Sequence, residues 1–365
     1  MLSYVHGPSI CPLSEPVVLR GREVGKDPME TIWEDALSDP AALDLTHAEA
    51  EVVDWGARRA LRLNGGLALI PGLGRTDATV EVLVGTDGPA YPGIAFRLTD
   101  VANYELAYAV PHASGLWDAL QYDPVWHGSN TWQLYHGPSY QQAAEVPTGR
   151  WYRLRLTYCG ARAALWVDDG RPLAVSQLSH PTARGLLGLW TYRPAHFAEL
   201  RVSTCSTLDL PPAPPPPAAS ESVSAGTVDA WFVEGYGVVA APGGRLVLNH
   251  YLPATMGQAR LMRRFEAREE GEVRLRFGYS DALSLTLDGR EVYAGECTFS
   301  GFDDRSARGY AELGHVEVRE TVTPGTHTLV AALRVSEPFG WGLVLAASES
   351  GSEEAGLRWL PAGFG

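Results

Sequence analysis

Hydrophobic and polar residues alternate over short stretches of this chain, and Gly, Pro, Asn or Asp residues separate the stretches. Residues 79–84 read Thr-Val-Glu-Val-Leu-Val, and residues 152–158 read Tyr-Arg-Leu-Arg-Leu-Thr-Tyr. Successive side chains of a strand point to opposite faces, so this alternation predicts strands with one buried face. In the first half of the chain we expect strands at 60–63, 79–84, 93–98, 104–110, 151–158, 163–167, 186–190 and 197–202.

The second half of the chain repeats this style. The dipeptides Asp169-Gly170 and Asp288-Gly289 predict tight hairpin turns, because these residues tolerate the positive φ angles that such turns require. Pro324-Gly325 indicates another turn, and Gly65-Gly66 indicates a break after a strand. Strands separated by turns about every 8–12 residues predict an all-β fold of β-sandwich (jelly-roll) type. The strands expected here are 246–249, 260–266, 272–279, 284–287, 291–294, 315–322, 326–335 and 342–346.

A proline-rich stretch divides the chain. Six prolines lie between Leu210 and Ala219, where neither a helix nor a paired strand can form. Such a run adopts extended polyproline II and acts as a semi-rigid spacer, so we expect few contacts between the parts that it joins. A chain of 365 residues also exceeds what one hydrophobic core usually organises. We therefore expect two β-sandwich domains at 1–208 and 221–350, a proline-rich linker at 209–220 and a tail at 351–365.

Charge and hydropathy exclude several kinds of partner. The formal net charge is −14 at pH 7, which argues against a nucleic-acid backbone or an anionic membrane as the main partner. No apolar run approaches the roughly 18 residues that cross a bilayer, so no membrane span is expected. Residues 1–24 lack the basic and then apolar layout of a secretory signal. This pattern predicts a cytoplasmic protein, or an exported one whose leader has been trimmed.

The four cysteines, Cys11, Cys159, Cys205 and Cys297, are scattered without C-x-x-C spacing. This distribution is typical of free thiols in a reducing compartment rather than of a disulfide framework or a zinc site. A Cys159–Cys205 bridge inside the first domain is the alternative.

Residues 108–152 are chemically unusual. Nine of these 45 positions are Tyr or Trp, against 10% aromatic residues in the whole chain. Aromatic faces stack on the C–H face of a sugar ring, and Asp, Asn, Gln and His hydrogen-bond its hydroxyls. The segment also contains many turn residues, which favours loops raised from a rigid sheet. The candidate ligand-binding residues are His112, Trp117, Asp118, Gln121, Tyr122, Trp126, His127, Asn130, Trp132, Gln133, Tyr135 and His136.

The same residues have a structural explanation, because Trp and Tyr are common in sandwich cores and buried polar groups often hold long loops in place. Trp151 and Tyr152 alternate along a strand after a turn, so one of them faces the core whatever the function. A third explanation makes the aromatic residues a protein interface.

Catalysis and metal binding are further alternatives. His112, Asp118, His127 and His136 can serve as general acids or bases. The three histidines can also hold a divalent metal, although loop histidines more commonly bond to neighbouring backbone.

Several segments resemble known families. Residues 93–97 and 103–106, with 149–154, 166–170 and 185–190, resemble laminin-G-like domains of the concanavalin-A-like superfamily, which includes a domain of bacterial 3-keto-glycoside hydrolases. The resemblance covers about residues 30–203, and the stretch 111–137 is similar to uncharacterised bacterial laminin-G-like proteins. Residues 277–281 and 287–290 resemble galactose-binding-like jelly-roll modules. These resemblances imply a lectin-like fold, a calcium ion at a loop rim and an oligosaccharide or glycoconjugate partner. Asp100 with Asn103, or Asp168 with Asp169, offer hard oxygen ligands for such a calcium ion. No other cofactor is expected.

The function predicted is therefore that of a carbohydrate-binding or interaction protein that uses the loops of its N-terminal domain. The alternatives are a glycoside-cleaving enzyme, hydrolase or lyase, with its site in the same loops, and a structural assembly module. The Glu-x-Asp-x-x-Glu strand of laminarinase-like enzymes does not occur in this sequence. Neither does a Gly-x-Ser-x-Gly elbow, a His-Glu-x-x-His helix or a phosphate-binding loop.

Overall fold

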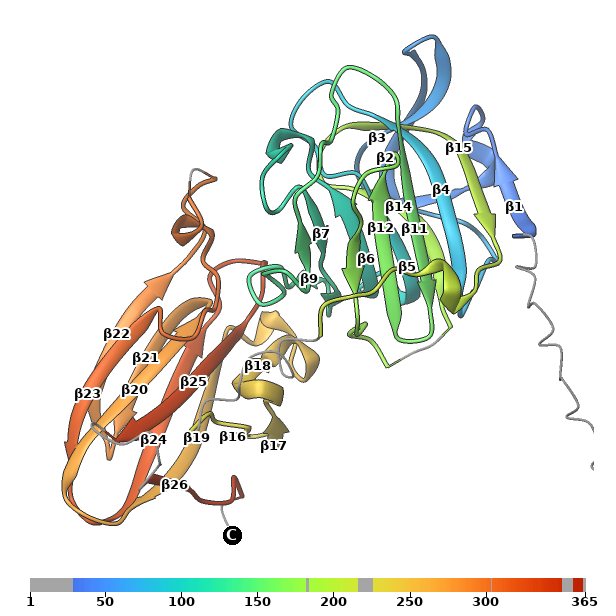
Figure 1. Cartoon of the computed structure of the whole chain (residues 1–365). Helices are drawn as coiled ribbons and strands as arrows, with labels where there is room; N and C mark the ends of the chain where they lie inside the picture. The colour runs from blue at the N-terminus through green and yellow to red at the C-terminus, as the bar shows by residue number, and fades with distance from the viewer. Residues whose placement is uncertain (1–28, 182–183, 216–225, 303, 350–356, 364–365) are drawn as a thin grey trace, which may run out of the picture.

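The computed structural model describes residues 29–181, 184–215, 226–302, 304–349 and 357–363. The expectations for the N-terminal 24 residues, for Cys11 and for the second half of the linker lie outside the described residues. In the described part of the chain the fold is all-β, as predicted, and the strands form two β-sandwich bodies that Figure 1 shows one beside the other.

The first body contains the strands up to Ser203. Its described residues include the short 3₁₀ helices η1 (Pro40–Ala42), η2 (Pro111–Ala113) and η3 (Thr207–Asp209). The strands are β1 (Thr31–Asp35), β2 (Asp44–Trp55), β3 (Arg58–Leu69), β4 (Ala78–Gly85), β5 (Gly93–Asp100), β6 (Asn103–Ala109), β7 (Leu120–Tyr122), β8 (Val125–Trp126), β9 (Ser129–Asn130), β10 (Gln141–Gln142), β11 (Tyr152–Cys159), β12 (Arg162–Val167), β13 (Leu173–Val175), β14 (Leu186–Thr191) and β15 (Ala195–Ser203).

These strands form one antiparallel sheet that curls over a core. The order along it is β10-β7-β6-β5-β14-β3-β15-β4-β11-β12-β13, with β1 beside β15, β2 beside β3, and β8 beside β6 and β9. β12 and β13, at one end, lie close to β6 and β7, near the other end. Inward-facing side chains of β11 show the predicted period of two, because Tyr152, Leu154, Leu156 and Tyr158 are buried while Arg153 is exposed. The core-facing member of the Trp151-Tyr152 pair is thus Tyr152.

The layer of β3, β14, β5 and β6 is apolar on its outer face as well. β5 is buried from Gly93 to Leu98 and β6 from Tyr104 to Ala109, without alternation. Strands of this kind are buried on both faces. The residues of this outer apolar cluster are Leu67, Leu69, Ala95, Leu98, Tyr104, Leu106, Tyr108, Val110, Ala113 and Val125.

The second body is a sandwich of two separate sheets. The larger has the order β17-β16-β19-β24-β21-β22 with β26 beside β19, and the smaller has the order β18-β25-β20-β23. Trp231, Trp341, Phe265 and Phe277 fill the core between them. Its 3₁₀ helices are η4 (Pro242–Gly244), η5 (Leu248–His250), η6 (Ala254–Met256) and η7 (Ser306–Arg308). The strands are β16 (Ala230–Val233), β17 (Gly237–Ala240), β18 (Arg245–Val247), β19 (Gln258–Ala267), β20 (Gly271–Tyr279), β21 (Asp281–Leu287), β22 (Arg290–Cys297), β23 (Val316–Val322), β24 (Gly325–Arg334), β25 (Gly342–Glu349) and β26 (Leu357–Trp359).

Some predicted turns and strand ends differ from those in the structure. Gly65-Gly66 does not end a strand: it forms a bulge inside β3, where a Cβ on Gly66 would lie 2.2 Å from the His47 carbonyl oxygen. At the Asp169-Gly170 turn, Asp168 takes the left-handed conformation, with φ 48°. Asp288-Gly289 behaves as predicted, with φ 52° and 82° between β21 and β22. Residues 248–250 are helical rather than extended, and residues 357–359 of the expected tail form β26.

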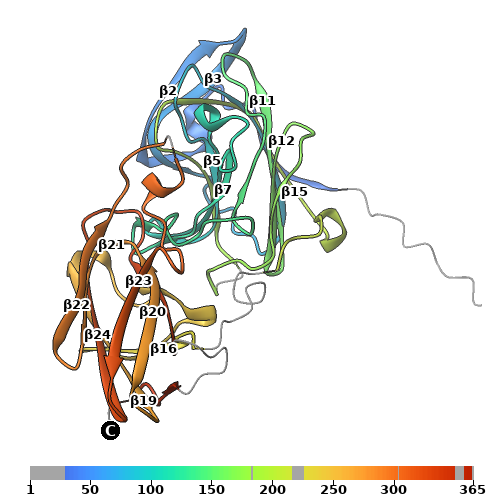
Figure 2. The same cartoon turned by 60° about the vertical axis from the view of Figure 1, so that its left-hand side comes forward.

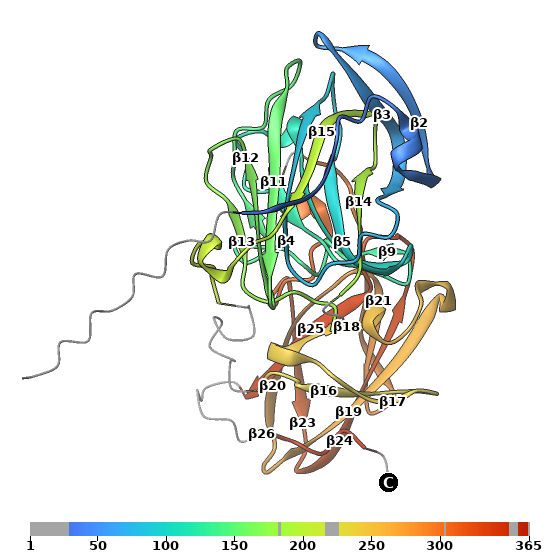
Figure 3. The ribbon, with the colours of Figure 1, turned by 90° about the vertical axis from the view of Figure 1, so that its right-hand side faces the viewer.

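The expectation of few contacts between the two bodies is wrong. Figures 1 and 3 place the loop around β9 against the second body near β18. The backbone of Gln133 donates to the Phe339 carbonyl oxygen (3.1 Å) and accepts from the Ala311 N–H (3.0 Å). The side chain of Leu134 is fully buried against Gly340 and Gly342. A proline run stiffens only the segment that contains it, so it does not prevent complementary loops on either side from packing together.

No helix of the described residues is long and apolar enough to cross a membrane. Cys159, Cys205 and Cys297 are free cysteines in this structure.

Candidate functional site

A cavity of about 340 Å³ lies between the two bodies, with walls from both. Figure 2 shows the segment after β22, in orange, reaching along the first body at this level. We call this space the aromatic cavity, because most of the side chains that line it are aromatic. The aromatic residues are Tyr91, Tyr108, Trp132, Trp190, Tyr192, Phe299, Phe302, Tyr310 and Phe339, and the others are Asp118, Gln121, Asn130, Arg193, Arg308 and Pro338.

The sheet face of the first body forms one wall of the aromatic cavity. In the ladder, Gly93 of β5 lies between Tyr108 of β6 and Trp190 of β14. A Cβ on Gly93 would lie 2.6 Å from the Tyr108 Cβ, so glycine leaves room for the two rings to meet across the strand. Their centroids are 5.6 Å apart and their planes are tilted by 50°. Tyr91, in the loop before β5, adds a third ring 6.3 Å from Tyr108.

The second body forms the opposite wall. Trp132, in the loop after β9, contacts three of its rings at centroid distances of 5.9 Å to Phe299, 5.7 Å to Tyr310 and 5.4 Å to Phe339. Phe299 follows β22, Tyr310 follows η7, and Phe339 lies between β24 and β25. Because these residues come from loops of the second body, neither body alone contains the whole cavity.

A buried ion pair between the two bodies lies at the cavity. Arg308 Nη2 is 2.8 Å from Asp118 Oδ2, and both side chains are almost completely buried, 3% and 2% exposed. The other carboxylate oxygen, Asp118 Oδ1, is buried and has no hydrogen-bond partner among the described residues. Burial raises the pKa of the Asp118 carboxyl, while the charges of Arg308 and Arg305 lower it. A ligand hydroxyl is a suitable donor for Oδ1, because a buried acceptor without a partner is costly.

Two amide side chains are held at the cavity by neighbours. Asn130 Nδ2 donates to the buried Asp123 (2.9 Å), and no other hydrogen bond of its side chain occurs in the described part of the chain. Gln121 is engaged at both ends: its Oε1 accepts from the Tyr108 hydroxyl (3.1 Å) and its Nε2 donates to the Asp118 carbonyl oxygen (3.0 Å). Asn130 therefore offers its Oδ1 to a ligand, whereas Gln121 mainly orients the Tyr108 ring.

Four of the twelve residues predicted from the sequence line the aromatic cavity: Asp118, Gln121, Asn130 and Trp132. His112 borders it, since its ring contacts Tyr91 (4.9 Å) and Phe302 (5.5 Å) edge-on. Trp117 lies behind it, under the guanidinium of Arg308 at 5.6 Å.

Tyr122 and Gln133 are completely buried and support the loops. The Tyr122 hydroxyl donates to Glu105 Oε2 (2.5 Å). Gln133 Nε2 donates to Glu337 Oε2 (3.0 Å) of the second body. For these two residues the structural explanation given above applies.

Tyr135 and His136 line a second, larger space between the bodies, described below. The Tyr135 hydroxyl lies 2.7 Å from Ser179 Oγ and 3.0 Å from His250 Nε2. Trp126 donates from its indole nitrogen to the same Ser179 Oγ (3.0 Å). The predicted site residues that line a cavity are thus divided between two spaces.

The three histidines that the sequence offers as metal ligands lie in different surroundings. His112 borders the aromatic cavity, and His136 lines the second space. His127 is an exposed turn residue whose N–H donates to Asn103 Oδ1 (3.0 Å). The Asn103 amide also donates to both oxygens of Asp100 (3.0 and 3.1 Å). Asp168 accepts a hydrogen bond from the Arg153 N–H (2.8 Å). The residues that the structure describes contain no group of three or more His, Cys, Asp or Glu that could hold a metal ion.

Sequence reasoning missed most of the aromatic cavity. Tyr91, Trp190, Tyr192 and Arg193 lie outside the segment 108–152 that it singled out, and so do the rings of the second body. The available signal was the predominance of apolar residues in β5 and β6, which Arg97 and Glu105 interrupt, because apolar residues on both faces of a strand indicate that its outer face is covered. Which distant loops cover that face depends on the docking of the two bodies.

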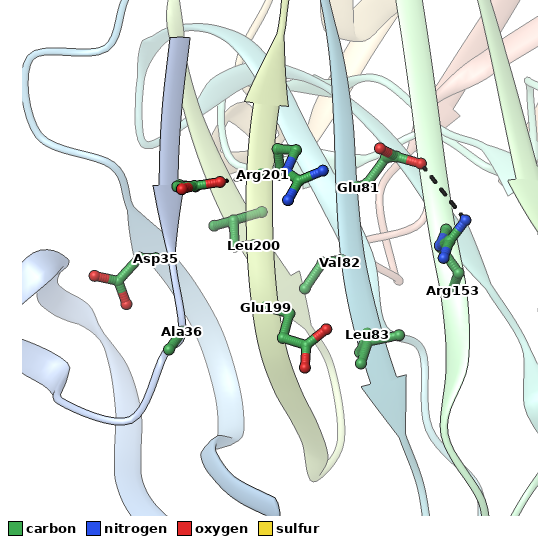
Figure 4. Close-up of a pocket in the computed structure, with 10 residues that line it drawn as sticks. Asp35, Ala36, Glu81, Val82, Leu83, Arg153, Glu199, Leu200 and Arg201 are labelled. Carbon is green, nitrogen blue, oxygen red and sulfur yellow. Dashed lines mark ion pairs between the residues drawn. The ribbon is translucent and has the colours of Figure 1, made fainter. Parts of the chain in front are cut away.

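A third hollow, of about 660 Å³, lies on the outer face of β1, β15, β4 and β11. Its charged side chains pair across strands: Figure 4 shows Glu81 with Arg153 (4.0 Å). Glu34 likewise pairs with Arg201 (3.4 Å). Among the described residues, no aromatic ring lines it. We interpret it as a solvated sheet face.

No protein-family model matches the chain, and no curated protein matches its sequence. Solved structures match about half of it. A carbohydrate-binding module, CBM66 from Bacillus subtilis, is 16% identical, with 48% of this chain and 98% of that chain covered and a TM-score of 0.34. A Bacillus subtilis protein of unknown function with a galectin-like fold is 9% identical (48% and 96%, TM-score 0.35). Domain 4 of a Geobacillus stearothermophilus extracellular arabinanase, in complex with arabinotriose, is 12% identical (48% and 93%, TM-score 0.30).

Proposed function

We propose that this protein binds a carbohydrate in the aromatic cavity between its two bodies. The observation that supports this proposal is the composition of the cavity wall. Nine aromatic side chains surround a space of about 340 Å³, and Asp118 Oδ1 and Asn130 Oδ1 remain as hydrogen-bond acceptors. Apolar walls with a few placed polar groups are typical of small-ligand sites. Aromatic faces together with hydroxyl-binding acceptors suit a sugar ring.

Binding is favoured over glycoside cleavage by the number of carboxylates. Hydrolysis of glycosides generally uses two carboxyl groups, about 5–10 Å apart, on either side of the scissile bond. Asp118 is the only carboxylate among the described residues that line the aromatic cavity, and it is paired with Arg308. The geometry therefore supports a binding role for Asp118.

We further infer that the first body is a lectin-like domain of laminin-G type and the second a galactose-binding-like domain. In support, two of the segments that carry the first resemblance, 93–97 and 185–190, lie in the neighbouring strands β5 and β14. These strands carry Gly93 and Trp190, which help to form the cavity wall.

Tyr192 provides the sharpest test. It lies in the loop between β14 and β15, lines the cavity and is 64% exposed, so its removal should leave the core intact. We expect Tyr192→Ala to weaken glycan binding about tenfold, because one stacking contact contributes about 1–1.5 kcal/mol. A glycan array on the full chain identifies the ligand, and titration calorimetry of wild type and variant measures the change, with calcium and with EDTA.

Tyr236→Ala is the matched control. Tyr236 is an exposed tyrosine of the second body with one edge-on tyrosine neighbour, as Tyr192 has, but it does not line the cavity. Its removal should leave affinity unchanged. If no glycan binds the wild type, or if both variants retain full affinity for the glycan found, the aromatic cavity is not a sugar site.

A further inference from the structure

The second space between the two bodies, of about 980 Å³, differs in chemistry from the aromatic cavity. We call it the basic groove. Arg245 of β18, Arg276 of β20 and Arg305 before η7 line it, and Glu312 is its only carboxylate among the described residues. The chain as a whole carries a net charge of −14. An excess of arginine in one hollow is therefore a local feature that the composition of the chain does not explain.

Two of the arginines are fixed by neighbours. Arg305 Nε donates to Glu312 Oε1 (2.8 Å), and the same guanidinium lies over the Tyr310 ring. Arg245 Nη1 lies 3.1 Å from the Nε2 atom of His136 and also donates to a backbone carbonyl oxygen of the first body. Both cations are thereby held at the groove in defined orientations.

Arg276 has no such partner. It is half-buried on β20, and among the residues that the structure describes it forms no ion pair. Glu317 lies directly opposite it on β23, but that carboxylate pairs instead with Arg274 (3.5 Å) and Arg319 (2.9 Å). The Glu317 carboxylate is therefore already paired with two other arginines. An anion from outside the chain would stabilise the half-buried Arg276 guanidinium by pairing with it.

The histidines of the groove add no charge that could replace an anion or compete with the arginines. Burial and, to a smaller extent, the charge of His180 lower the pKa of His250 to about 4. Burial, together with the charge of Arg245, also holds the pKa of His136 well below its usual value. At neutral pH the described residues that line the groove therefore include three cations, Arg245, Arg276 and Arg305, and one carboxylate, Glu312.

The groove also offers groups that suit a sugar. The hydroxyls of Tyr135 and Ser179 meet His250, and the Tyr140 ring also lines the space. Hydroxyls, an imidazole and an aromatic face can bond and stack with a sugar ring, whereas an isolated inorganic anion would use only the arginines.

We propose that the basic groove is a second binding site, for an acidic oligosaccharide of the uronate type, whose carboxylate pairs with Arg276 and its neighbouring arginines. Arginine presents two parallel N–H groups that match a carboxylate. This site is separate from the aromatic cavity, and the proposal does not depend on the ligand found there.

The test uses the full chain and three probes: trigalacturonic acid, the corresponding neutral galactose trisaccharide and inorganic sulfate. By titration calorimetry at low salt we expect trigalacturonic acid to bind at least tenfold more tightly than either of the others. Its affinity should fall as sodium chloride is added. Arg276→Gln should weaken the binding about tenfold, and Arg276→Lys should fall between that variant and wild type.

Arg260→Gln is the control, since Arg260 is an exposed arginine of β19 on the other sheet of the second body, and it should bind as wild type does. Circular dichroism checks that Arg276→Gln is folded. Equal affinity for the neutral trisaccharide, equal affinity for sulfate, or unchanged binding by a folded Arg276→Gln variant would each overturn the proposal.

Discussion

Replacement of Arg308 by methionine should lower the free energy of unfolding by about 3–5 kcal/mol. The Arg308 guanidinium neutralises Asp118 across the contact between the two bodies, 2.8 Å away, with both side chains nearly inaccessible to water. Methionine keeps much of the volume of arginine but leaves a buried carboxylate without its cation. Breaking a buried ion pair from one side is costly for that reason.

The measurement is urea unfolding followed by circular dichroism and by tryptophan fluorescence, since two probes reveal whether the two bodies unfold in one step. The double variant Asp118→Asn with Arg308→Met should recover most of the loss, because it leaves no unpaired charge behind. Simple addition of the two single effects would contradict this account of the pair. Arg334→Met, which removes an exposed ion pair with Glu296 (3.1 Å, 56% and 67% exposed), should cost less than about 1 kcal/mol.

Replacement of Glu105 by glutamine should change how stability depends on pH. Glu105 is completely buried under the candidate loops, where it accepts hydrogen bonds from the Tyr122 hydroxyl (2.5 Å) and the His180 N–H (2.8 Å). Burial raises the pKa of Glu105 and these hydrogen bonds partly offset it, so that the resulting pKa is about 7. The folded state therefore holds a proton that the unfolded state releases near pH 4.5.

A raised carboxyl pKa gives a definite sign. The stability that protonated Glu105 contributes is fully present below pH 4.5 and is lost as the pH rises to about 7. The loss amounts to about 3 kcal/mol, from roughly 1.4 kcal/mol per pKa unit. Glutamine does not ionise, so the variant should lack this loss. The difference in unfolding free energy, wild type minus variant, should fall by about 3 kcal/mol between pH 4.5 and pH 8.

Urea unfolding at five pH values measures this difference directly. Other buried groups, such as Asp123 and His180, titrate in the same range, but they are present in both proteins and their contributions cancel in the subtraction. Glu269→Gln, which removes an exposed carboxylate, should run parallel to wild type. A difference between wild type and Glu105→Gln that stays constant with pH would show that Glu105 does not ionise across this range.

The strands of both bodies could be predicted from the sequence because their information is local. In β4, β11, β19, β20 and β24 the period of two marks which side chains face the core. The Asp288-Gly289 hairpin was predictable for the same reason, since two adjacent residues alone determine that turn. Among the strands that were missed, β1 and β26 are short and pair with strands far along the chain, β15 and β19.

The candidate site could be predicted only in part. The aromatic and polar segment 108–152 drew attention to Asp118, Asn130 and Trp132, and these residues do line a cavity. Their local sequence could not show that Tyr122 and Gln133, in the same segment, would be buried supports. Alternation is weak there because the strands are only two or three residues long.

What only the tertiary structure decided is the meeting of the two bodies. A run of six prolines predicts a stiff spacer, and nothing in that run shows whether the flanking loops attract each other. Arg308, Phe299 and Phe339 lie about 170–210 residues from the residues of the first body that they contact. Interactions at such separation depend on shape and charge complementarity between folded surfaces, which no local pattern encodes. The sequence by itself determined two β-sandwiches and a rich aromatic segment, whereas the docking of the bodies made one cavity aromatic and the other basic.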